Sequence, residues 1–282
     1  MTQLSIGTCA TLACLLEVTA PKVGNVHRSA DFEDLTFTDF TVSAALVGPI
    51  LEQVRELGVG KTILEAVTAT QRTVGTNTNL GILLLIAPLA AVPRNQSIEH
   101  GIAGVLDSLS ADDAAHVYEA IRAARPGGLG TAPRMDIAGP APMSLLEAMS
   151  AAADRDLVAR QYSSRFADVL RRVVPWLVET RGTGASLTQA IIHTQIRLLA
   201  AEPDSLILRK CGLEVAQQAQ QIASMALEAG GYDDENYLAV LADLDFWMRC
   251  DGHRRNPGTT ADLIAAGLFV ALRDNLLPAN WS

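Results

Sequence analysis

The chain has 282 residues, a length that suits one large domain or two modest ones and can bury a sizeable core. Its formal net charge of −9 argues against a surface that binds nucleic acid. Hydrophobic residues make up 49% of the chain but aromatic residues only 5%. A core built mainly from Ala, Leu, Ile and Val favours close-packed helices.

The N-terminal stretch MTQLSIGTCATLACLLEVTAPK is apolar, yet it does not resemble a signal peptide. No Lys or Arg precedes Lys22, and Glu17 interrupts the apolar run. The most apolar segment, Gly81 to Val92, is too short to cross a membrane. We therefore expect a cytoplasmic protein with no membrane partner.

Apolar residues recur with helical spacing along almost the whole chain. This pattern predicts an all-α fold: residues 1–282 as a single multi-helix bundle, with long loops that form a polar nucleotide-binding cleft. Thr38 or Asp39 is expected to cap the second helix. The expected helices are 3–19, 38–57, 61–72, 79–92, 97–107, 111–124, 143–152, 154–180, 184–201, 210–229, 234–249 and 259–276.

Two segments interrupt the helical pattern. Residues 20–37 contain Pro, Gly, Asn and several charges, and residues 125–143 hold most of the clustered Gly and Pro. A loop as long as 125–143 is either a linker between domains or a lid or binding loop. The sequence leaves both interpretations open.

Polar residues collect beside helices at four places: PKVGNVHR (21–28), TVGTNTNLGILLLIAP (73–88), HTQIRLLAAEPDSLILRKCG (193–212) and RCDGHRRNPGTTADLIAAGLF (249–269). A helix N-terminus offers unpaired N–H groups and partial positive charge to a phosphate, and glycine allows close approach. Thr259 and Thr260 are expected to cap the helix that carries Asp262, and Asn77 or Thr78 the helix near Asn79. Ordinary helix capping explains the polar residues at any single one of these segments. The four segments together indicate a binding site for a polyanion.

These four places, in this order, resemble the triphosphoribosyl-dephospho-CoA synthase family. The resemblance runs from LLEVTAPKVGNVHR through GTNTNLGILLL and HTQIRLLAAEPDSLILRKCG to NPGTTADLIAAGLFVAL. It implies an all-helical enzyme that takes ATP, expels adenine and joins C1′ of the triphosphoribosyl group to a ribose hydroxyl of dephospho-CoA. It further implies that Mg²⁺ and basic groups hold the triphosphate while a carboxylate orients or deprotonates the acceptor.

The resemblance also implies roles for individual residues. The expected catalytic carboxylates are Glu17, Asp204 and Asp262, and the expected metal-holding carboxylates are Asp34, Asp204 and Asp262. Lys22 and Arg28 are expected to face phosphate, and Gly75, Asn77 and Asn79 to form a turn against the nucleotide. The other expected nucleotide-binding residues are Asn25, His27, Arg209, Asn256 and Thr259.

The chain departs from the typical family motifs, and this keeps other functions open. It has GTNTNLG where the synthases read more like GVNTHKG, His27 where they usually carry an acid, and NPGTTAD in place of a PGGSAD-like string. This resembles a divergent branch associated with archaea, planctomycetes and methylotrophs. One alternative is ribosyl-phosphate transfer in making a methanopterin-type cofactor; another is an ATP-dependent phosphate-transferring or hydrolysing enzyme. The Ala-rich helices make a homodimer plausible.

Overall fold

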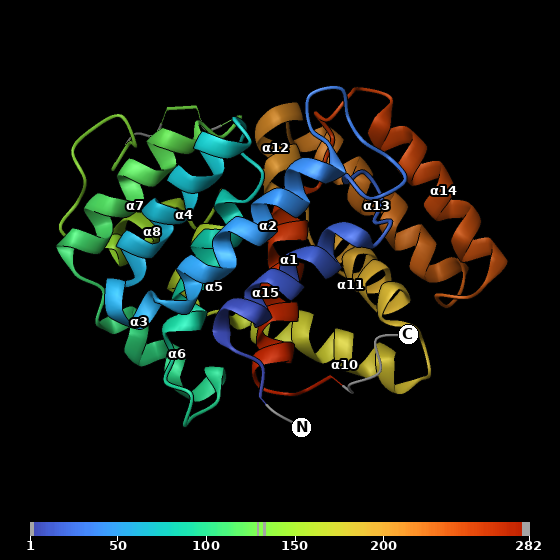
Figure 1. The fold of residues 1–282 in the computed structure, drawn as a ribbon. Helices are drawn as coiled ribbons and strands as arrows, with labels where there is room; N and C mark the ends of the chain where they lie inside the picture. Colours follow the sequence, from blue (N-terminus) through green and yellow to red (C-terminus); the bar gives the residue numbers. More distant parts are fainter. Residues whose placement is uncertain (1–2, 129, 132–133, 278–282) are drawn as a thin grey trace.

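A computed structural model describes residues 3–128, 130–131 and 134–277, and these residues confirm the all-α prediction. Within them no β-strand forms, and two isolated β-bridges, His27–Ala30 and Phe32–Leu35, lie in the segment before α2. The helices, arranged as in Figure 1, are α1 (Ile6–Thr19), α2 (Phe37–Glu52), α3 (Val54–Leu57), α4 (Val59–Thr73), α5 (Leu80–Ala91), α6 (Ile98–Asp107), α7 (Ala111–Ala124), α8 (Leu145–Ala152), α9 (Leu157–Ser163), the π-helix η1 (Val169–Val173), α10 (Val174–Gly182), α11 (Leu187–Ala201), α12 (Ser205–Cys211), α13 (Leu213–Ala229), α14 (Glu235–Arg249) and α15 (Gly258–Arg273).

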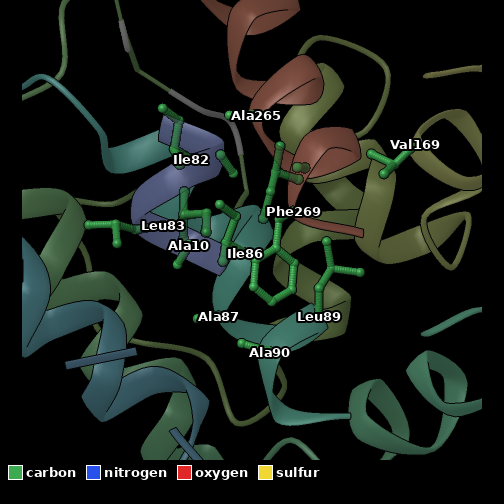
Figure 2. Close-up of a cluster of buried hydrophobic side chains, with 14 of the residues drawn as sticks. Ala10, Ile82, Leu83, Ile86, Ala87, Leu89, Ala90, Val169, Ala265 and Phe269 are labelled. Atoms are coloured by element: carbon green, nitrogen blue, oxygen red, sulfur yellow. The ribbon is translucent and has the colours of Figure 1, made fainter. Parts of the chain in front are cut away.

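The larger hydrophobic core surrounds α5 and α15, which pack against each other and against α1. Figure 2 shows Phe269 of α15 beside Ile86 and Leu89 of α5, with Ala10 of α1 nearby. All four side chains are fully buried. Burying a large apolar side chain contributes roughly 1.5–3 kcal/mol, and small residues such as Ala10 allow the helices to approach closely. The composition therefore correctly indicated a core of aliphatic residues and alanine.

A smaller hydrophobic core lies among α11, α12, α13 and α14. Alanines on one face of α13, among them Ala219 and Ala223, pack toward Tyr237 and Leu244 of α14. Val23, from the segment between α1 and α2, joins this cluster. In Figure 1, α13 and α14 lie on one side of the molecule, α7 and α8 on the other, and α1 and α15 between them. The chain between α1 and α2 is thus anchored to the C-terminal helices.

The predicted helix at 154–180 is wrong, because the chain turns sharply near its middle. Arg165 and Phe166 have positive φ angles of 55° and 62°, which end α9 before η1 begins. The buried Phe166 ring and a hydrogen bond from its backbone N to the Gln161 carbonyl oxygen (2.7 Å) stabilise this turn. Tertiary packing overrides the helical pattern here.

Two other helix boundaries differ from the sequence prediction. Gly212, with φ 88°, separates α12 from α13, so the expected helix 210–229 is divided. The cap of α2 is Thr36, whose side chain accepts from the Asp39 backbone N while Asp39 accepts from Thr36, so neither Thr38 nor Asp39 is the N-cap. None of the described helices is both long and apolar enough to cross a membrane.

Candidate active site

A cavity of about 800 Å³ borders the larger hydrophobic core, and Leu80, Val117 and Leu145 of that core line it. Residues of α1, α5, α7, α8, α9, α12 and α15 line it, together with parts of the segments 20–36, 74–79, 125–143 and 250–257. Its volume lies in the upper part of the range for small-molecule sites. The helices on both sides of the 125–143 segment share the larger core, and described residues of this segment line the cavity. These positions favour the binding-loop interpretation over a linker.

Asp262 of α15 brings a carboxylate to the cavity wall, against the first turn of α5. A Cβ atom placed on Gly81 would lie 2.0 Å from Oδ2 of Asp262, so only glycine fits at position 81. Asp262 makes no hydrogen bond or ion pair with any residue that the structure describes. Burial, and then the negative charge of Glu17, raise its pKa well above the usual value. An unpartnered carboxyl with a raised pKa is typical of catalytic sites.

Glu17, an expected catalytic carboxylate, also lines the cavity, whereas Lys22, which was expected to face phosphate, does not. Lys22 is fully buried, with its Nζ 2.8 Å from Oε1 of Glu17 and bonded to the Glu17 carbonyl oxygen at the end of α1. The prediction that Lys22 faces phosphate is therefore wrong. Its ammonium group instead compensates a buried carboxylate beside Asp262.

The residues of the first polar segment, 21–28, lie in different surroundings, and only some of them reach the cavity. Asn25 lines the cavity with Asn256, to whose Oδ1 it donates over 2.6 Å, and Gln195 donates to Asn25 Oδ1 over 2.9 Å. His27 and Arg28 do not line the cavity. His27 is buried, which lowers its pKa, while Arg28 is exposed. The geometry therefore does not support their expected role in nucleotide binding.

The turn before α5 lies at the cavity wall, and Gly75, Asn77 and Asn79, which were expected to form a turn against the nucleotide, all line it. The Asn77 side chain accepts from the Leu80 backbone N at 3.1 Å, but the N-cap residue of α5 is Asn79 and not the predicted Asn77 or Thr78. Asn79 is buried and donates to Thr70 Oγ1 over 3.3 Å. The side chain of Asn79 is thus held by the protein itself.

Asp204 is a shared cap for two helices. Its Oδ1 accepts from the backbone N atoms of Leu206 (2.8 Å) and Ile207 (3.1 Å) at the start of α12. Its Oδ2 accepts from the backbone N (2.7 Å) and Oγ1 (2.8 Å) of Thr260 at the start of α15. Asp204 is buried, and both oxygens are engaged. Asp204, and not the predicted Thr259 and Thr260, therefore caps α15.

The three carboxylates predicted to hold a metal are not assembled into a metal site. Asp34 pairs with His253 at 2.9 Å, and Asp204 is engaged in helix capping. Across the described part of the chain, no three acidic, histidine or cysteine side chains are placed to hold a metal ion. A resident metal in this triad therefore does not fit. A Mg²⁺ ion that arrives with a nucleoside triphosphate belongs to the substrate, and its ligands come largely from phosphate and water.

Four basic residues at the cavity form what we call the cation group: Arg125, Arg155, Arg209 and Lys210. Arg209 Nη1 lies 2.6 Å from Oδ2 of Asp156, the residue after Arg155. The start of the 125–143 segment lies against the same place, because a Cβ on Gly127 would be 3.3 Å from Cε of Lys210. Within the described chain, the side chains of Arg125, Arg155 and Lys210 have no hydrogen-bonding or ionic partner. Such cations in a protein of charge −9 indicate an anionic ligand.

Of the cation group, the sequence analysis found only Arg209. Lys210 follows Arg209 directly in the quoted segment, and Arg125 begins the Gly- and Pro-rich segment. Their positions next to a predicted site residue and a predicted loop were the available sequence signal for a binding role. Burial lowers the pKa of Lys210, as expected for a cation that lacks a partner.

Thr259 is buried and accepts a hydrogen bond from Ser205 Oγ at 3.0 Å.

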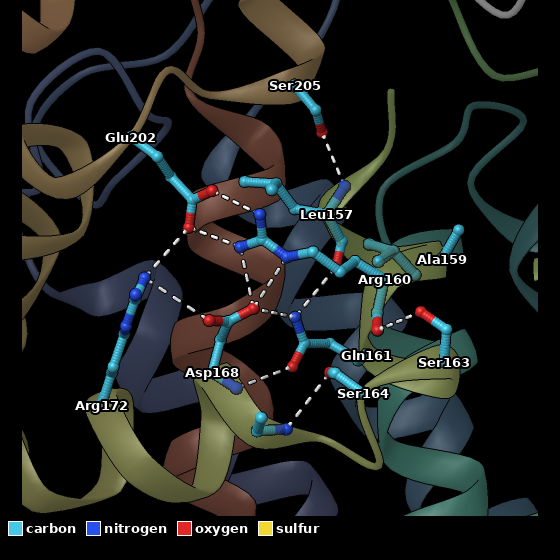
Figure 3. Close-up of polar contacts among 12 residues, drawn as sticks. Leu157, Ala159, Arg160, Gln161, Ser163, Ser164, Asp168, Arg172, Glu202 and Ser205 are labelled. Atoms are coloured by element: carbon cyan, nitrogen blue, oxygen red, sulfur yellow. Dashed lines mark hydrogen bonds and ion pairs between the residues drawn. The ribbon is translucent and has the colours of Figure 1, made fainter. Parts of the chain in front are cut away.

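A polar network behind the cavity fixes the connection from α11 to α12 (Figure 3). Arg160 of α9 pairs with both Asp168 and Glu202, and Arg172 also lies within 3.3 Å of Glu202. Gln161 Nε2 donates to Asp168 over 2.7 Å. Glu202 precedes Asp204 by two residues, so this network helps to position the shared cap. The sequence gave no signal for it, because its members come from three separate segments.

Several known proteins are similar to this chain in sequence. A family model for ATP:dephospho-CoA triphosphoribosyl transferase matches residues 3–280. The 2-(5''-triphosphoribosyl)-3'-dephosphocoenzyme-A synthase of Klebsiella pneumoniae is 34% identical over 105 residues, covering 37% of each chain. A probable synthase of the same name from Pseudomonas syringae pv. tomato is 32% identical over 114 residues, or 40% of this chain and 38% of its own. The chain thus matches less than two fifths of the length of these relatives.

A solved structure shares the fold. It is the crystal structure of an Archaeoglobus fulgidus protein described as a candidate triphosphoribosyl-dephospho-CoA synthase. The two align with a TM-score of 0.63 at 24% identity, over 84% of this chain and 99% of the other. At this identity the likeness supports the fold, while the family model covers nearly the whole sequence. The chain therefore belongs to the ATP:dephospho-CoA triphosphoribosyl transferase family.

Proposed function

We propose that the protein transfers the triphosphoribosyl group of ATP to a ribose hydroxyl of dephospho-CoA and releases adenine. One observation carries the proposal: an unpartnered carboxyl, Asp262, lies in the same cavity as unpartnered cations. The transfer needs both, because the triphosphate is a polyanion and the acceptor hydroxyl must lose a proton. Family membership supplies the identity of donor and acceptor.

The cation group binds the triphosphate. Arg209 is held in place by Asp156, while the free ammonium group of Lys210 beside it meets phosphate oxygens. Charge-assisted contacts of this kind are stronger than neutral hydrogen bonds, particularly where water is partly excluded. ATP enters with its accompanying Mg²⁺, and the cations compensate the remaining negative charge.

Asp262 and Glu17 act on the ribose. The C1′–N9 bond of ATP breaks while the bond from C1′ to the acceptor oxygen forms, so positive charge develops at C1′. The carboxylate of Glu17, compensated by Lys22 on its buried side, stabilises this charge. In its ionised form Asp262 takes the proton of the hydroxyl, and the raised pKa makes this form a stronger base than an ordinary aspartate. The departing adenine takes a proton from water, and Asp262 returns the hydroxyl proton to water after product release, so no net proton is gained or lost.

The test is product analysis by chromatography. Purified protein is incubated with ATP, Mg²⁺ and dephospho-CoA, and we expect adenine and a triphosphoribosylated acceptor in equal amounts. Formation of ADP or AMP would instead indicate attack at phosphorus. If the folded protein binds ATP and dephospho-CoA but releases no adenine, the proposed function is wrong.

A further inference from the structure

One part of the cavity is used by neither Asp262 nor the cation group. We call it the α7–α8 wall, and it consists of Tyr118 and Ile121 of α7, Leu145 and Met149 of α8, and Arg134 of the segment between them. Four of these five residues present mainly apolar surface, and the charged residues Arg122 and Asp136 line the cavity beside them. The wall lies on the side of the molecule away from α13 and α14 (Figure 1).

The segment that carries Arg134 is fixed against α7. Tyr118 Oη donates to the Met135 carbonyl oxygen over 2.8 Å. Arg122, one turn later on α7, donates to the carbonyl oxygens of Ile137 (3.0 Å) and Gly139 (3.3 Å). Residues 135–139 therefore follow the helix, and Arg134 is placed directly beside the Tyr118 contact. Binding at this wall needs little further ordering of the segment.

The chemistry of the wall suits a particular kind of ligand. Arg134 is exposed and has no partner among the residues that the structure describes. Next to it, Tyr118, Leu145 and Met149 are nearly buried but still border the cavity. A free guanidinium group beside an apolar surface fits a phosphate joined to a chain rich in methyl and methylene groups.

We propose that the α7–α8 wall is the acceptor subsite, where Arg134 binds a phosphate oxygen of the acceptor and the apolar residues contact its pantetheine arm. This inference rests on the proposed function, which requires a second substrate in the same cavity. The reacting hydroxyl, the phosphate and the arm of dephospho-CoA need three kinds of surface. The cavity provides a carboxylate, a free arginine and an apolar wall within one volume of about 800 Å³.

The probe is 4′-phosphopantetheine, which has the arm and one phosphate but no nucleoside. We expect calorimetry to show that it binds the protein equally well with and without saturating ATP. Arg134→Ala should weaken this binding about tenfold, the effect of losing one charge-assisted contact, and leave the affinity for ATP unchanged. Arg171→Ala, which removes an exposed arginine away from the cavity, is the matched control and should change neither affinity.

Three outcomes would overturn the subsite. They are competition between 4′-phosphopantetheine and ATP, an equal effect of Arg134→Ala and Arg171→Ala, and binding of inorganic phosphate as tight as that of the whole probe. None of these measurements requires turnover. Failure of the subsite is therefore distinguishable from failure of the proposed function, which is judged by adenine release.

Discussion

The carboxylate side of the cavity and its cation group differ in how their polar atoms are engaged. Around Asp262, most polar side chains are already bonded to the protein: Lys22 to Glu17, and Asn25 to Gln195 and Asn256. In the cation group only Arg209 has an ionic partner in the described chain. The polar groups around Asp262 are bonded to the protein before any ligand arrives. Most of the cation group would gain an ionic partner only from a bound ligand.

Under the proposed function, this difference separates the residues expected to take part in the chemistry from those expected to bind substrate. Groups fixed by several hydrogen bonds lose little freedom at the reacting centre, and such preorganisation contributes to catalysis. Free surface cations instead contribute Coulomb attraction, which salt weakens. Changes in the first region should therefore affect turnover or folding, and changes in the second should affect affinity.

The largest effect is expected for Asp262→Asn, which removes the proposed base and keeps the size of the side chain. We expect the rate of adenine release to fall by roughly 10²–10⁴-fold, the usual contribution of a positioned general base. The affinity for ATP should change little. A rate within threefold of the unaltered protein, measured by chromatography on a variant with normal circular dichroism, would remove Asp262 from the reaction.

The next effect concerns Asp204, which the sequence placed in the chemistry and the structure places in helix capping. Asp204→Ala removes acceptors from the starts of both α12 and α15, so the free energy of unfolding should fall by about 2–4 kcal/mol. Urea titration measures this change. Asp34→Ala, at an exposed ion pair, is the control and should change it by less than ~0.5 kcal/mol. Unchanged stability with lost turnover would restore Asp204 as a catalytic candidate.

A smaller effect is expected in the cation group. Lys210→Ala should weaken ATP binding about tenfold, with a smaller difference at high salt, because one cationic contact to phosphate is lost. Calorimetry at two ionic strengths measures both quantities. Arg28→Ala tests the sequence prediction that Arg28 faces phosphate. The structure predicts no change in ATP affinity for this variant, because Arg28 is exposed and lies outside the cavity. An equal loss of affinity in the two variants would contradict the proposed position of the triphosphate.

The smallest expected effect is on stability as a function of pH. Because burial and Glu17 raise the pKa of Asp262, the folded state retains a proton that the unfolded state releases above the ordinary aspartate range. Stability from this group is therefore complete at low pH and is lost as the pH rises toward the raised value. Asp262→Asn should be more stable than the unaltered protein at neutral pH, and the difference should shrink as the pH falls into the ordinary aspartate range. Urea unfolding across this range would contradict the shift if the difference were independent of pH.

The sequence predicted well those features that follow from local rules. Gly75, Asn77 and Asn79 were identified because glycine and asparagine just before an apolar helix have direct backbone consequences, and all three line the cavity. The all-helical class followed from apolar spacing and composition. Helix breaks at Gly212 and Phe166 were missed, the second because its cause lies in packing and not in the local residues.

Roles that depend on contacts between distant segments could not be predicted. Lys22 resembled a phosphate ligand because nothing in the sequence shows that it folds back onto Glu17. Asp204 resembled a catalytic acid because its second oxygen meets Thr260, 56 residues later. Lys210 was overlooked because its importance lies in the absence of a partner in the described fold, which only coordinates reveal.

The shared cap at Asp204 joins the starts of the helix that carries Arg209 and Lys210 and the helix that carries Asp262. The distance between the cation group and Asp262 is consequently set by the scaffold. Under the proposed function, a nucleoside diphosphate or monophosphate held by the cation group would not bring its anomeric carbon as close to the Asp262 carboxyl as ATP does. We expect discrimination by phosphate-chain length to reside in this rigid connection and not in any contact with the purine.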